Sequence, residues 1–463
     1  MVAVLKEETG LAGKVRFSAG WKILFSAGDI SISVPLAILM FFQLFFMTDI
    51  AGLRPDYAAW AVMIGRLWDA VNDPWFGILS DRIKSRWGRR RTIMLFGAVP
   101  IGVGFALMWQ VPPFDPLGLA AYYTLTFIIF NTAFTFIRIG YYAMVPELTS
   151  DYDERISING YLMAYSISGS LGAIILITLL RGFFPDPVQL FMIIGISLGL
   201  LVILPPLLVF FLTKGKLSET TASDLSMAES IRATLSNKPF WRLIGLYTMS
   251  WTTVSVIAAA LVYFANYYLR VPDQANYFVL AAQGSALLFV PLWVWASKKL
   301  DKSRAFIIGS LSWLVILLSI SSLGSHQVGL AYLLAALSGA GIACAYVLPW
   351  SMIPDVVEFD QLRTGERREG SYYAFASFFQ KMAAGIAIWA MGQALAFANY
   401  ITPSAADPLP LQPVEAVQAI RIFMGPVPAV LLIVAVLFAW RYPLTREKHQ
   451  LICDELAGGR VEE

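Results

Sequence analysis

Charged residues are scarce in this sequence, and their scarcity excludes a soluble fold. Asp, Glu, Lys and Arg make up 14% of the 463 residues, about half the share found in ordinary soluble proteins. Hydrophobic residues make up 58%, and the mean hydropathy is +0.66. A soluble protein of this size cannot bury so much apolar surface, because surface falls slowly relative to volume. The composition therefore predicts a polytopic membrane protein.

Cysteine and histidine are nearly absent, with two of each. Cys344 and Cys453 lie far apart in the sequence, which argues against a disulfide framework and against a thiolate metal site. His326 and His449 fall in a predicted loop and a predicted tail, which argues against a histidine-based metal site. Positive and negative side chains nearly balance, so nothing favours a nucleic-acid partner. We also see no nucleophile–base pair and no sizeable soluble domain, and therefore expect a protein that is neither an enzyme nor a receptor.

Apolar stretches long enough for spanning helices recur along the whole chain and predict an all-α membrane protein with twelve spans. They are Trp21–Phe46, Tyr57–Ile78, Ile93–Val111, Leu119–Met144, Ile156–Leu180, Leu190–Leu212, Leu243–Tyr268, Tyr277–Ala296, Phe306–Leu323, Ala331–Ile353, Tyr372–Phe397 and Ile422–Trp440. The longest polar stretch separates the sixth span from the seventh. We therefore expect a six-helix bundle over 1–213, a cytoplasmic linker over 214–239, a second six-helix bundle over 240–442 and a cytoplasmic tail over 443–463.

Lysine and arginine are distributed unevenly across the predicted loops. If the N-terminus lies in the cytoplasm, only Arg54, Arg181 and Arg270 fall in loops on the opposite side. Four more lie within spans, namely Arg66, Arg138, Lys381 and Arg421. All the others fall in the termini and the cytoplasmic loops, which is the positive-inside pattern. We therefore expect both termini in the cytoplasm and the protein in the plasma membrane, or in the inner membrane of a bacterium.

The two halves of the chain resemble each other. AMVPEL at the end of the fourth span is matched by SMIPDV at the end of the tenth. The basic run 81–91 after the second span has a weaker counterpart at 298–304 after the eighth. Asp81, Arg86 and Arg89 in the first run are expected to set topology and to pack the inward gate. Duplicated halves are typical of secondary transporters, which place their site between the repeats near the middle of the membrane.

The second predicted span carries the strongest group of intramembrane ionisable residues. Asp69 and Asp73 lie four residues apart in the segment GRLWDAVNDP, so that they share one helix face, with Asn72 beside them. Two carboxylates and an amide oxygen suit a small cation, and repulsion between the carboxylates would alternatively make one of them a proton carrier. The structural alternative is that Arg66 neutralises Asp69. Since charges in hydrocarbon are costly, we favour a functional site.

Three further polar groups lie inside predicted spans. Thr135, Arg138 and Tyr142 share one face of the fourth span, where Arg138 either binds an anionic or polar substrate group or forms a salt bridge with Asp69 or Asp73. Lys381 in the eleventh span needs a counter-charge. Asp29 stands about two turns into the first span. Each is a candidate for function because of the cost of burying its charge.

The segment GRLWDAVNDPWFG followed by SRWGRRR resembles the signature of the glycoside–pentoside–hexuronide:cation symporters, the melibiose-permease branch of the major facilitator superfamily. The likeness continues through DYDERISINGY, LPWSMIPDVVEFD and EGSYYAFASFFQK, and covers about residues 20–442. The last two segments are also similar to the vertebrate sodium-dependent lysophosphatidylcholine symporters. This resemblance implies two pseudo-symmetric six-helix bundles in the major facilitator fold.

The resemblance also implies roles for single residues. It places a sodium or proton site at Asp69, Asn72 and Asp73, with Thr135 as a further ligand and Asp69 and Asp73 as the metal ligands if sodium is the coupling ion. Lys381 matches the family's lysine near that site.

The expected substrate pocket departs from the family's pattern. It is expected to comprise Asp29, Ser33, Arg138, Tyr142, Met163 and Lys381. Within it, Ser33 matches the first-span sugar-binding aspartate, and Arg138 replaces a fourth-span aspartate. Met163 replaces an arginine, and Tyr142 replaces a tryptophan.

Taken together, the residues and the resemblance predict a cation-coupled symporter of a small solute, most simply a glycoside, another sugar or a sugar acid. The alternative is a lysophospholipid or another amphiphile. The expected partners are the substrate, a monovalent cation and membrane lipid, with no cofactor besides the coupling ion. We expect the protein to act as a monomer by alternating access.

Overall fold

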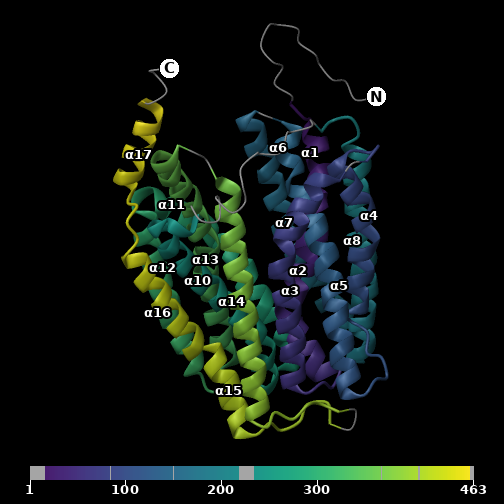
Figure 1. The fold of residues 1–463 in the computed structure, drawn as a ribbon. Helices are drawn as coiled ribbons and strands as arrows, with labels where there is room; N and C mark the ends of the chain where they lie inside the picture. The colour runs from purple at the N-terminus through teal and green to yellow at the C-terminus, as the bar shows by residue number, and fades with distance from the viewer. Residues whose placement is uncertain are drawn as a thin grey trace.

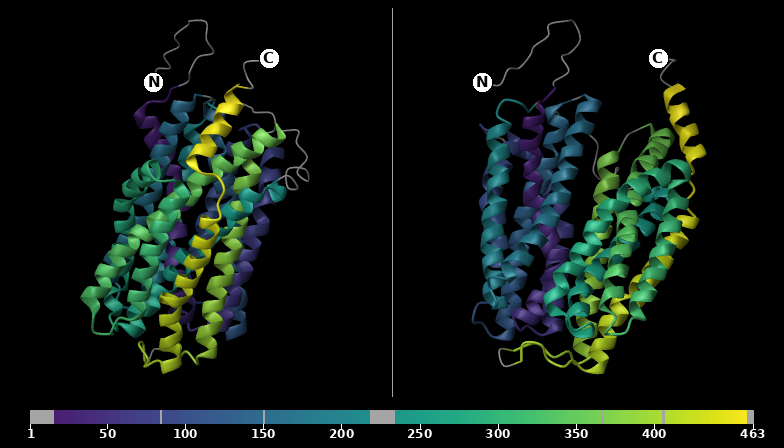
Figure 2. Two further views of the ribbon diagram at one scale, coloured as in Figure 1. Left: turned by 90° about the vertical axis from the view of Figure 1, so that its left-hand side faces the viewer. Right: turned by 180° about the vertical axis from the view of Figure 1, so that it is seen from behind.

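The computed structural model describes residues 16–83, 85–149, 151–217, 234–365, 368–404 and 407–458 of the chain. The described residues form helices joined by short loops, with no strand among them. Figures 1 and 2 show two bundles of long helices side by side, with both termini at the same end of the molecule. This is the all-α arrangement of two bundles expected from the sequence.

The N-terminal bundle carries the first six spans. Its elements are α1 (Ala19–Ser26), η1 (Ala27–Asp29), α2 (Ile30–Phe45), η2 (Phe46–Ile50), α3 (Pro55–Arg82), α4 (Arg89–Leu107), α5 (Pro116–Tyr142), α6 (Met144–Leu148), α7 (Tyr152–Arg181) and α8 (Pro187–Leu212). The first span consists of α1, η1, α2 and η2 in sequence. The single apolar stretch predicted there is thus a helix that contains one 3₁₀ turn and ends in a π-helical turn.

The C-terminal bundle repeats this plan. Its elements are α10 (Lys238–Tyr263), η3 (Phe264–Tyr268), η4 (Pro272–Gln274), α11 (Ala275–Lys299), α12 (Lys302–Ser321), α13 (Val328–Thr364), α14 (Glu369–Phe397), α15 (Val414–Met424) and α16 (Pro426–Trp440), followed by the tail helix α17 (Arg446–Gly458). Two boundaries differ from the expectation by more than a few residues. The tenth span continues as α13 to Thr364, and the last span begins earlier as α15 and bends at Gly425 before Pro426, which cannot continue a helix without losing a hydrogen bond.

Eleven helices among the described residues are long and apolar enough to cross a membrane. The remaining predicted span corresponds to α3, which has 28 residues and lies between α5 and α14 in contact with both. It is less apolar because Arg66, Asp69 and Asp73 lie along it. This less apolar helix is therefore the one that carries the candidate cation site.

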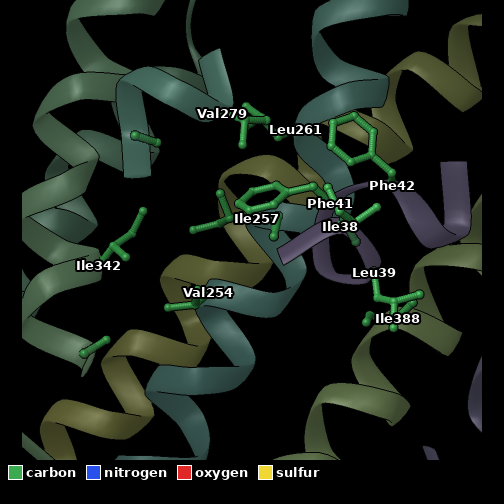
Figure 3. Close-up of a cluster of buried hydrophobic side chains, with 14 of the residues drawn as sticks. Ile38, Leu39, Phe41, Phe42, Val254, Ile257, Leu261, Val279, Ile342 and Ile388 are labelled. Carbon is green, nitrogen blue, oxygen red and sulfur yellow. The ribbon is translucent and has the colours of Figure 1, made fainter. Parts of the chain in front are cut away.

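The two bundles contact each other along three pairs of helices: α2 with α10, α3 with α14, and α7 with α11. Figure 3 shows apolar side chains of α2 and α10 together, with Ile38 and Phe41 of α2 next to Ile257 of α10. All three are buried. Burial of such side chains favours association by about 25 cal/mol per Å². The contact between α2 and α10 is therefore apolar, whereas ion pairs join the bundles elsewhere, among them Lys381 of α14 with Asp69 of α3.

The first helices of the two halves end in the same backbone turn. In η2 the amide of Ala51 donates to the carbonyl of Phe46, and in η3 the amide of Leu269 donates to the carbonyl of Phe264. Each π-helical turn is followed by a residue with positive φ: Gly52 at 70° and Arg270 at 56°. The internal duplication therefore extends to a local irregularity of a kind that is frequent at functional sites.

Candidate functional site

Three helices from both bundles bring the predicted ionisable residues together. Asp69 and Asp73 lie in the middle of α3, Thr135 and Arg138 lie on α5, and Lys381 comes from α14 in the other bundle. Asp69, Thr135 and Lys381 are buried. The helical spacing predicted that the pairs on α3 and α5 would share faces, and packing of these faces against α14 forms one cluster.

Asp73 is the centre of this cluster. One of its oxygens, Oδ2, lies 2.7 Å from Arg138 Nη2 and 2.7 Å from Lys381 Nζ. Its other oxygen, Oδ1, lies 3.0 Å from Thr135 Oγ1. Lys381 Nζ is also 3.0 Å from Asp69 Oδ1, which lies 3.2 Å from Thr135 Oγ1. The lysine therefore joins both carboxylates, and it does so across the boundary between the bundles.

The cluster is balanced in charge, with two carboxylates against one guanidinium and one ammonium. Burial without pairing would cost several kcal/mol per ion, so each charge needs its partner in this conformation. Arg138 thus forms the salt bridge that the sequence offered as the alternative to a substrate contact. Its side chain is 23% exposed and that of Asp73 19%, whereas Lys381 and Asp69 are 9% and 4% exposed. The Arg138–Asp73 pair is therefore the accessible part of the cluster.

Asp29 and Tyr142 form a second pair next to this cluster. The Tyr142 hydroxyl donates to Asp29 Oδ1 at 2.7 Å, and Tyr142 follows Arg138 by one helical turn on α5. The other oxygen of Asp29 is buried and has no donor in good hydrogen-bond geometry among the described residues, although the hydroxyls of Ser33 and Ser166 lie near the carboxylate. A buried carboxylate oxygen without a donor is costly, so this pair has unused capacity to bind a ligand or a proton.

Two predicted pocket residues lie outside these pairs. Ser33 donates to the backbone carbonyl of Asp29 at 2.9 Å and is buried, so its hydroxyl is engaged within its own helix. Met163 lies on α7 with 61% of its surface exposed. Neither residue forms a hydrogen bond with the charged cluster in the described part of the chain.

Asn72 and Arg66 point elsewhere. Asn72 donates from its amide to the carbonyl of Asn131 at 3.4 Å, while its own buried oxygen lacks a donor among the described residues. Arg66 lies with its guanidinium 5.7 Å from the ring centroid of Phe127. Among the described ion pairs, Asp69 is matched with Lys381 and not with Arg66. Asp69 therefore forms its direct ion pair with a lysine of the other bundle. Arg66, the structural alternative considered from sequence, acts on Asp69 only as a nearby charge.

The basic run of the N-terminal half packs within its own bundle. Arg89 Nη2 and Arg90 Nε lie 2.8 Å and 3.0 Å from Glu147 Oε1 on α6, and Arg86 stacks on Trp87. Arg86 and Arg89 are the residues expected from the sequence, and Arg90 is an additional partner of Glu147. The side chain of Asp81 lies outside the described part of the structure.

The C-terminal half has an equivalent ion pair. Lys302, at the start of α12, lies 2.8 Å from Asp355 on α13. Asp355 stands in SMIPDV where Glu147 stands in AMVPEL, and in both halves the basic partner opens the next helix after a basic run. The sequence repeat therefore corresponds to a repeated acid–base contact.

At the end of the molecule opposite the termini, hydrogen bonds join the two bundles. Thr48 Oγ1 lies 2.7 Å from the hydroxyl of Tyr263. Tyr267 and Tyr400 both donate to Asp49 Oδ1, Tyr400 at 2.9 Å. We call this set, Thr48, Asp49, Tyr263, Tyr267 and Tyr400, the interbundle latch. It forms where the two π-helical turns end the first span of each half, and nothing in the local sequence signalled it.

The latch favours the conformation in which this end is closed. Replacing Tyr267 and Tyr400 together by Phe should therefore raise the population open at this end by roughly tenfold or more, because hydrogen bonds to charged groups contribute about 1.5–3 kcal/mol each. Spin labels at the exposed positions Leu117 and Leu411, with both cysteines replaced, would report the change as a longer distance.

The matched control is Tyr122→Phe. Its hydroxyl donates at 2.7 Å to the carbonyl of Leu107, within the N-terminal bundle and between the ends of α4 and α5. Removing that bond should leave the distance distribution between the labels unchanged. An unchanged distribution in the Tyr267/Tyr400 double variant would show that the latch does not hold the bundles closed.

Comparison with known families agrees with the arrangement of helices. The family described as MFS/sugar transport protein matches residues 24–446. An uncharacterised symporter of Synechocystis sp. is 32% identical, over 96% of this chain and 97% of its own.

Two further relatives carry more specific names. The putative glycoside/cation symporter YagG of Escherichia coli is 28% identical, over 95% of both chains. The sodium-dependent lysophosphatidylcholine symporter 1-B of Danio rerio is 26% identical, over 97% of this chain and 91% of its own.

Solved structures share the fold at low sequence identity. A D-xylose–proton symporter superposes with a TM-score of 0.66 at 14% identity, over 91% of this chain and 97% of its own. A bacterial homologue of the human lysosomal transporter Spinster, in an inward-facing and unoccupied conformation, gives 0.67 at 12% identity, over 95% of this chain and 99% of its own. These likenesses establish the arrangement of the two bundles.

Proposed function

The chain belongs to the MFS/sugar transport protein family, and from this premise we propose that it is a cation-coupled symporter whose coupling site is the Asp69/Asp73 cluster. The observation that carries the proposal is Lys381, a cation from one bundle bound between two carboxylates of the other. The ammonium group occupies the position that a coupling cation would need. Binding of the cation and the position of the two bundles are therefore linked through one side chain.

The coupling step follows from competition for the carboxylates. A sodium ion between Asp69 and Asp73 would displace the Lys381 ammonium, and a proton on either carboxylate would weaken the same pair. Either event releases a contact between α3 and α14 and so favours a different arrangement of the bundles. A ligand shifts a conformational equilibrium only through its different affinities for the two states, and this exchange supplies the difference.

Arg138 connects the cation to the substrate in this scheme. Its guanidinium bonds Asp73 at 2.7 Å, and Tyr142 lies one turn further along the same helix face. When the cation takes Asp73, Arg138 becomes available to a polar or anionic group on the substrate. We therefore propose a glycoside or sugar acid, held by Arg138, Tyr142 and the unpaired oxygen of Asp29, with Lys381 free to assist.

A lysophospholipid or another amphiphile is the second candidate. It is favoured by the exposed thioether of Met163, since an apolar group there suits an acyl chain better than a sugar, and by the lysophosphatidylcholine symporter among the relatives. A phosphate group would suit Arg138 as well as a sugar acid does.

Several expectations about the setting belong to the same proposal. Both termini would lie in the cytoplasm, in the plasma membrane or a bacterial inner membrane, so that the interbundle latch closes the external side. The protein would act as a monomer and would need no cofactor besides the coupling ion.

Uptake into proteoliposomes tests the proposal. The purified full-length chain should accumulate a radiolabelled glycoside or sugar acid when a sodium or a proton gradient is imposed, and should lose the accumulation when an ionophore collapses that gradient. Lysophosphatidylcholine is tested in parallel, with protein-free liposomes as the control. Gradient-driven uptake of the lysolipid alone would replace the sugar by the amphiphile. If uptake of these solutes is the same with and without a sodium or proton gradient, cation coupling is contradicted.

A further inference from the structure

A second polar cluster lies at the end of the molecule that carries the termini, away from the transport site. The tail helix α17 lies beside the end of α13 there (Figure 1). His449 and Cys453 are four residues apart on α17 and therefore share one face. That face meets Glu358 of α13. The sequence argued against a metal site because cysteine and histidine are so few, yet the fold brings one of each together with a carboxylate.

The three ligand atoms are close to one another. Cys453 Sγ lies 3.4 Å from Glu358 Oε2 and 3.7 Å from His449 Nε2, and His449 Nε2 lies 2.7 Å from Glu358 Oε2. Bonds of about 2.0–2.3 Å at the tetrahedral angle place the ligands of a zinc ion about 3.4–3.6 Å apart. The two distances to sulfur already match this spacing. The third would lengthen by somewhat less than an ångström as the histidine–glutamate hydrogen bond gives way to two metal bonds.

From this geometry we propose that Glu358, His449 and Cys453 bind a divalent transition-metal ion of the zinc class. Thiolate, imidazole and carboxylate form a donor set that suits zinc, whereas magnesium and calcium prefer oxygen ligands alone. Three protein ligands leave a fourth position for water.

The charges around Glu358, His449 and Cys453 favour binding of a cation. Asp355 Oδ1 lies 3.5 Å from His449 Nε2 and adds negative charge beside the three ligands. Lys302 offsets part of that charge, since its ammonium lies 2.8 Å from both oxygens of Asp355. Asp355 therefore acts as a neighbour of the metal site and not as its fourth ligand.

The metal would fasten the tail helix to the end of the tenth span. At its start α17 is already tied to the C-terminal bundle, because the amide of Arg446 donates to Asp301 Oδ1 at 3.0 Å. Further along, the cluster supplies the second attachment. Two attachments one to two turns apart fix the direction of a short helix that a single contact would leave free to swing. Metal binding would thus set the position of the tail on the cytoplasmic face.

Cobalt(II) titration of the full-length protein in detergent tests the site. The protein is prepared without a polyhistidine tag and freed of metal by a chelator. One cobalt ion should bind per chain and produce a thiolate-to-cobalt charge-transfer band, which zinc should abolish by displacement. Cys453→Ser should remove the band, and Glu358→Gln and His449→Ala should each weaken cobalt binding by about tenfold or more.

Cys344→Ser is the matched control, because this cysteine is buried inside α13 and bonds the carbonyl of Phe306. It should leave the cobalt spectrum unchanged. All variants are checked for monodispersity by gel filtration. No charge-transfer band in the parent protein, or a band that survives Cys453→Ser, would overturn the proposal.

A second measurement does not depend on the variants. In the parent protein, zinc should slow alkylation of Cys453 by a maleimide by about tenfold or more, as read at the tryptic peptide by mass spectrometry. Magnesium at the same concentration should have no effect. Equal rates with and without zinc would show that the three side chains only pack the tail helix against α13.

Discussion

Asp73→Asn is expected to abolish gradient-driven accumulation, lowering the accumulation ratio to that of passive equilibration. The substitution keeps the shape of the side chain but leaves Arg138 and Lys381 facing Asp69 alone, so the cluster becomes positive and repels a cation. Removing one charge from a buried, hydrogen-bonded pair costs about 2–5 kcal/mol, which corresponds to a loss of cation affinity of about two orders of magnitude. Uptake into proteoliposomes and binding of radioactive sodium to the detergent-solubilised protein measure the two effects.

The matched control is Asp56→Asn on the same helix. Asp56 pairs with Arg54, whose side chain is 65% exposed, and exposed pairs contribute little. Uptake and sodium binding should therefore match those of the parent. If Asp73→Asn accumulated substrate as the parent does, the coupling site could not be at this cluster. If it still exchanged substrate without accumulating it, the role of Asp73 in coupling alone would be supported.

Lys381→Met should produce the largest loss of stability. It leaves Asp69 and Asp73 with only Arg138 between them, and removing one partner of a buried ion pair costs about 3–5 kcal/mol. The free energy of unfolding should fall by that amount, with a lower melting temperature in detergent. Excess sodium should recover part of the loss if the ion can replace the missing ammonium, and an equal concentration of a large organic cation should not.

A second substitution separates the ion pair from general packing. Asp69→Asn in the Lys381→Met background should restore part of the stability, because it removes the carboxylate that lost its partner. Lys448→Met in the tail, an exposed lysine, should leave the melting temperature unchanged. Absence of recovery in the double variant would mean that Lys381 stabilises the bundle through packing and not through its charge.

The sequence predicted those parts of the site that lie on single helices. Asp69 and Asp73 share a helix face because they are four residues apart, and Thr135 and Arg138 share one because they are three residues apart. The partner of Asp73 on α14 is 308 residues away, and no local pattern could pair it. The residue pattern marked Lys381 only as needing a counter-charge, and it left Arg66 as the alternative partner of Asp69. The family resemblance alone placed Lys381 near the cation site.

Other features escaped because they depend on irregular backbone or on docking between elements. The latch arises where a π-helical turn ends each first span, and hydropathy does not report such turns. The Glu358/His449/Cys453 cluster needs α17 to dock on α13. The spacing of His449 and Cys453 on one face of a tail helix was the available signal. It did not indicate a metal site, because their carboxylate partner, Glu358, is 91 residues from His449 in the sequence.

The neutrality of the buried charges has an electrical consequence for the transport cycle. With Lys381 bound, four acidic groups within the spans, Asp29, Asp49, Asp69 and Asp73, are balanced by four basic ones, Arg66, Arg138, Lys381 and Arg421. The unloaded carrier therefore turns over without moving net charge through the hydrocarbon. A loaded carrier bears one additional positive charge, and the membrane voltage acts on that step with about 2.3 kcal/mol per 100 mV for a full crossing. Transport of a neutral sugar should therefore generate a current. The membrane voltage should accelerate the inward movement of the loaded carrier and should not affect the return of the unloaded carrier.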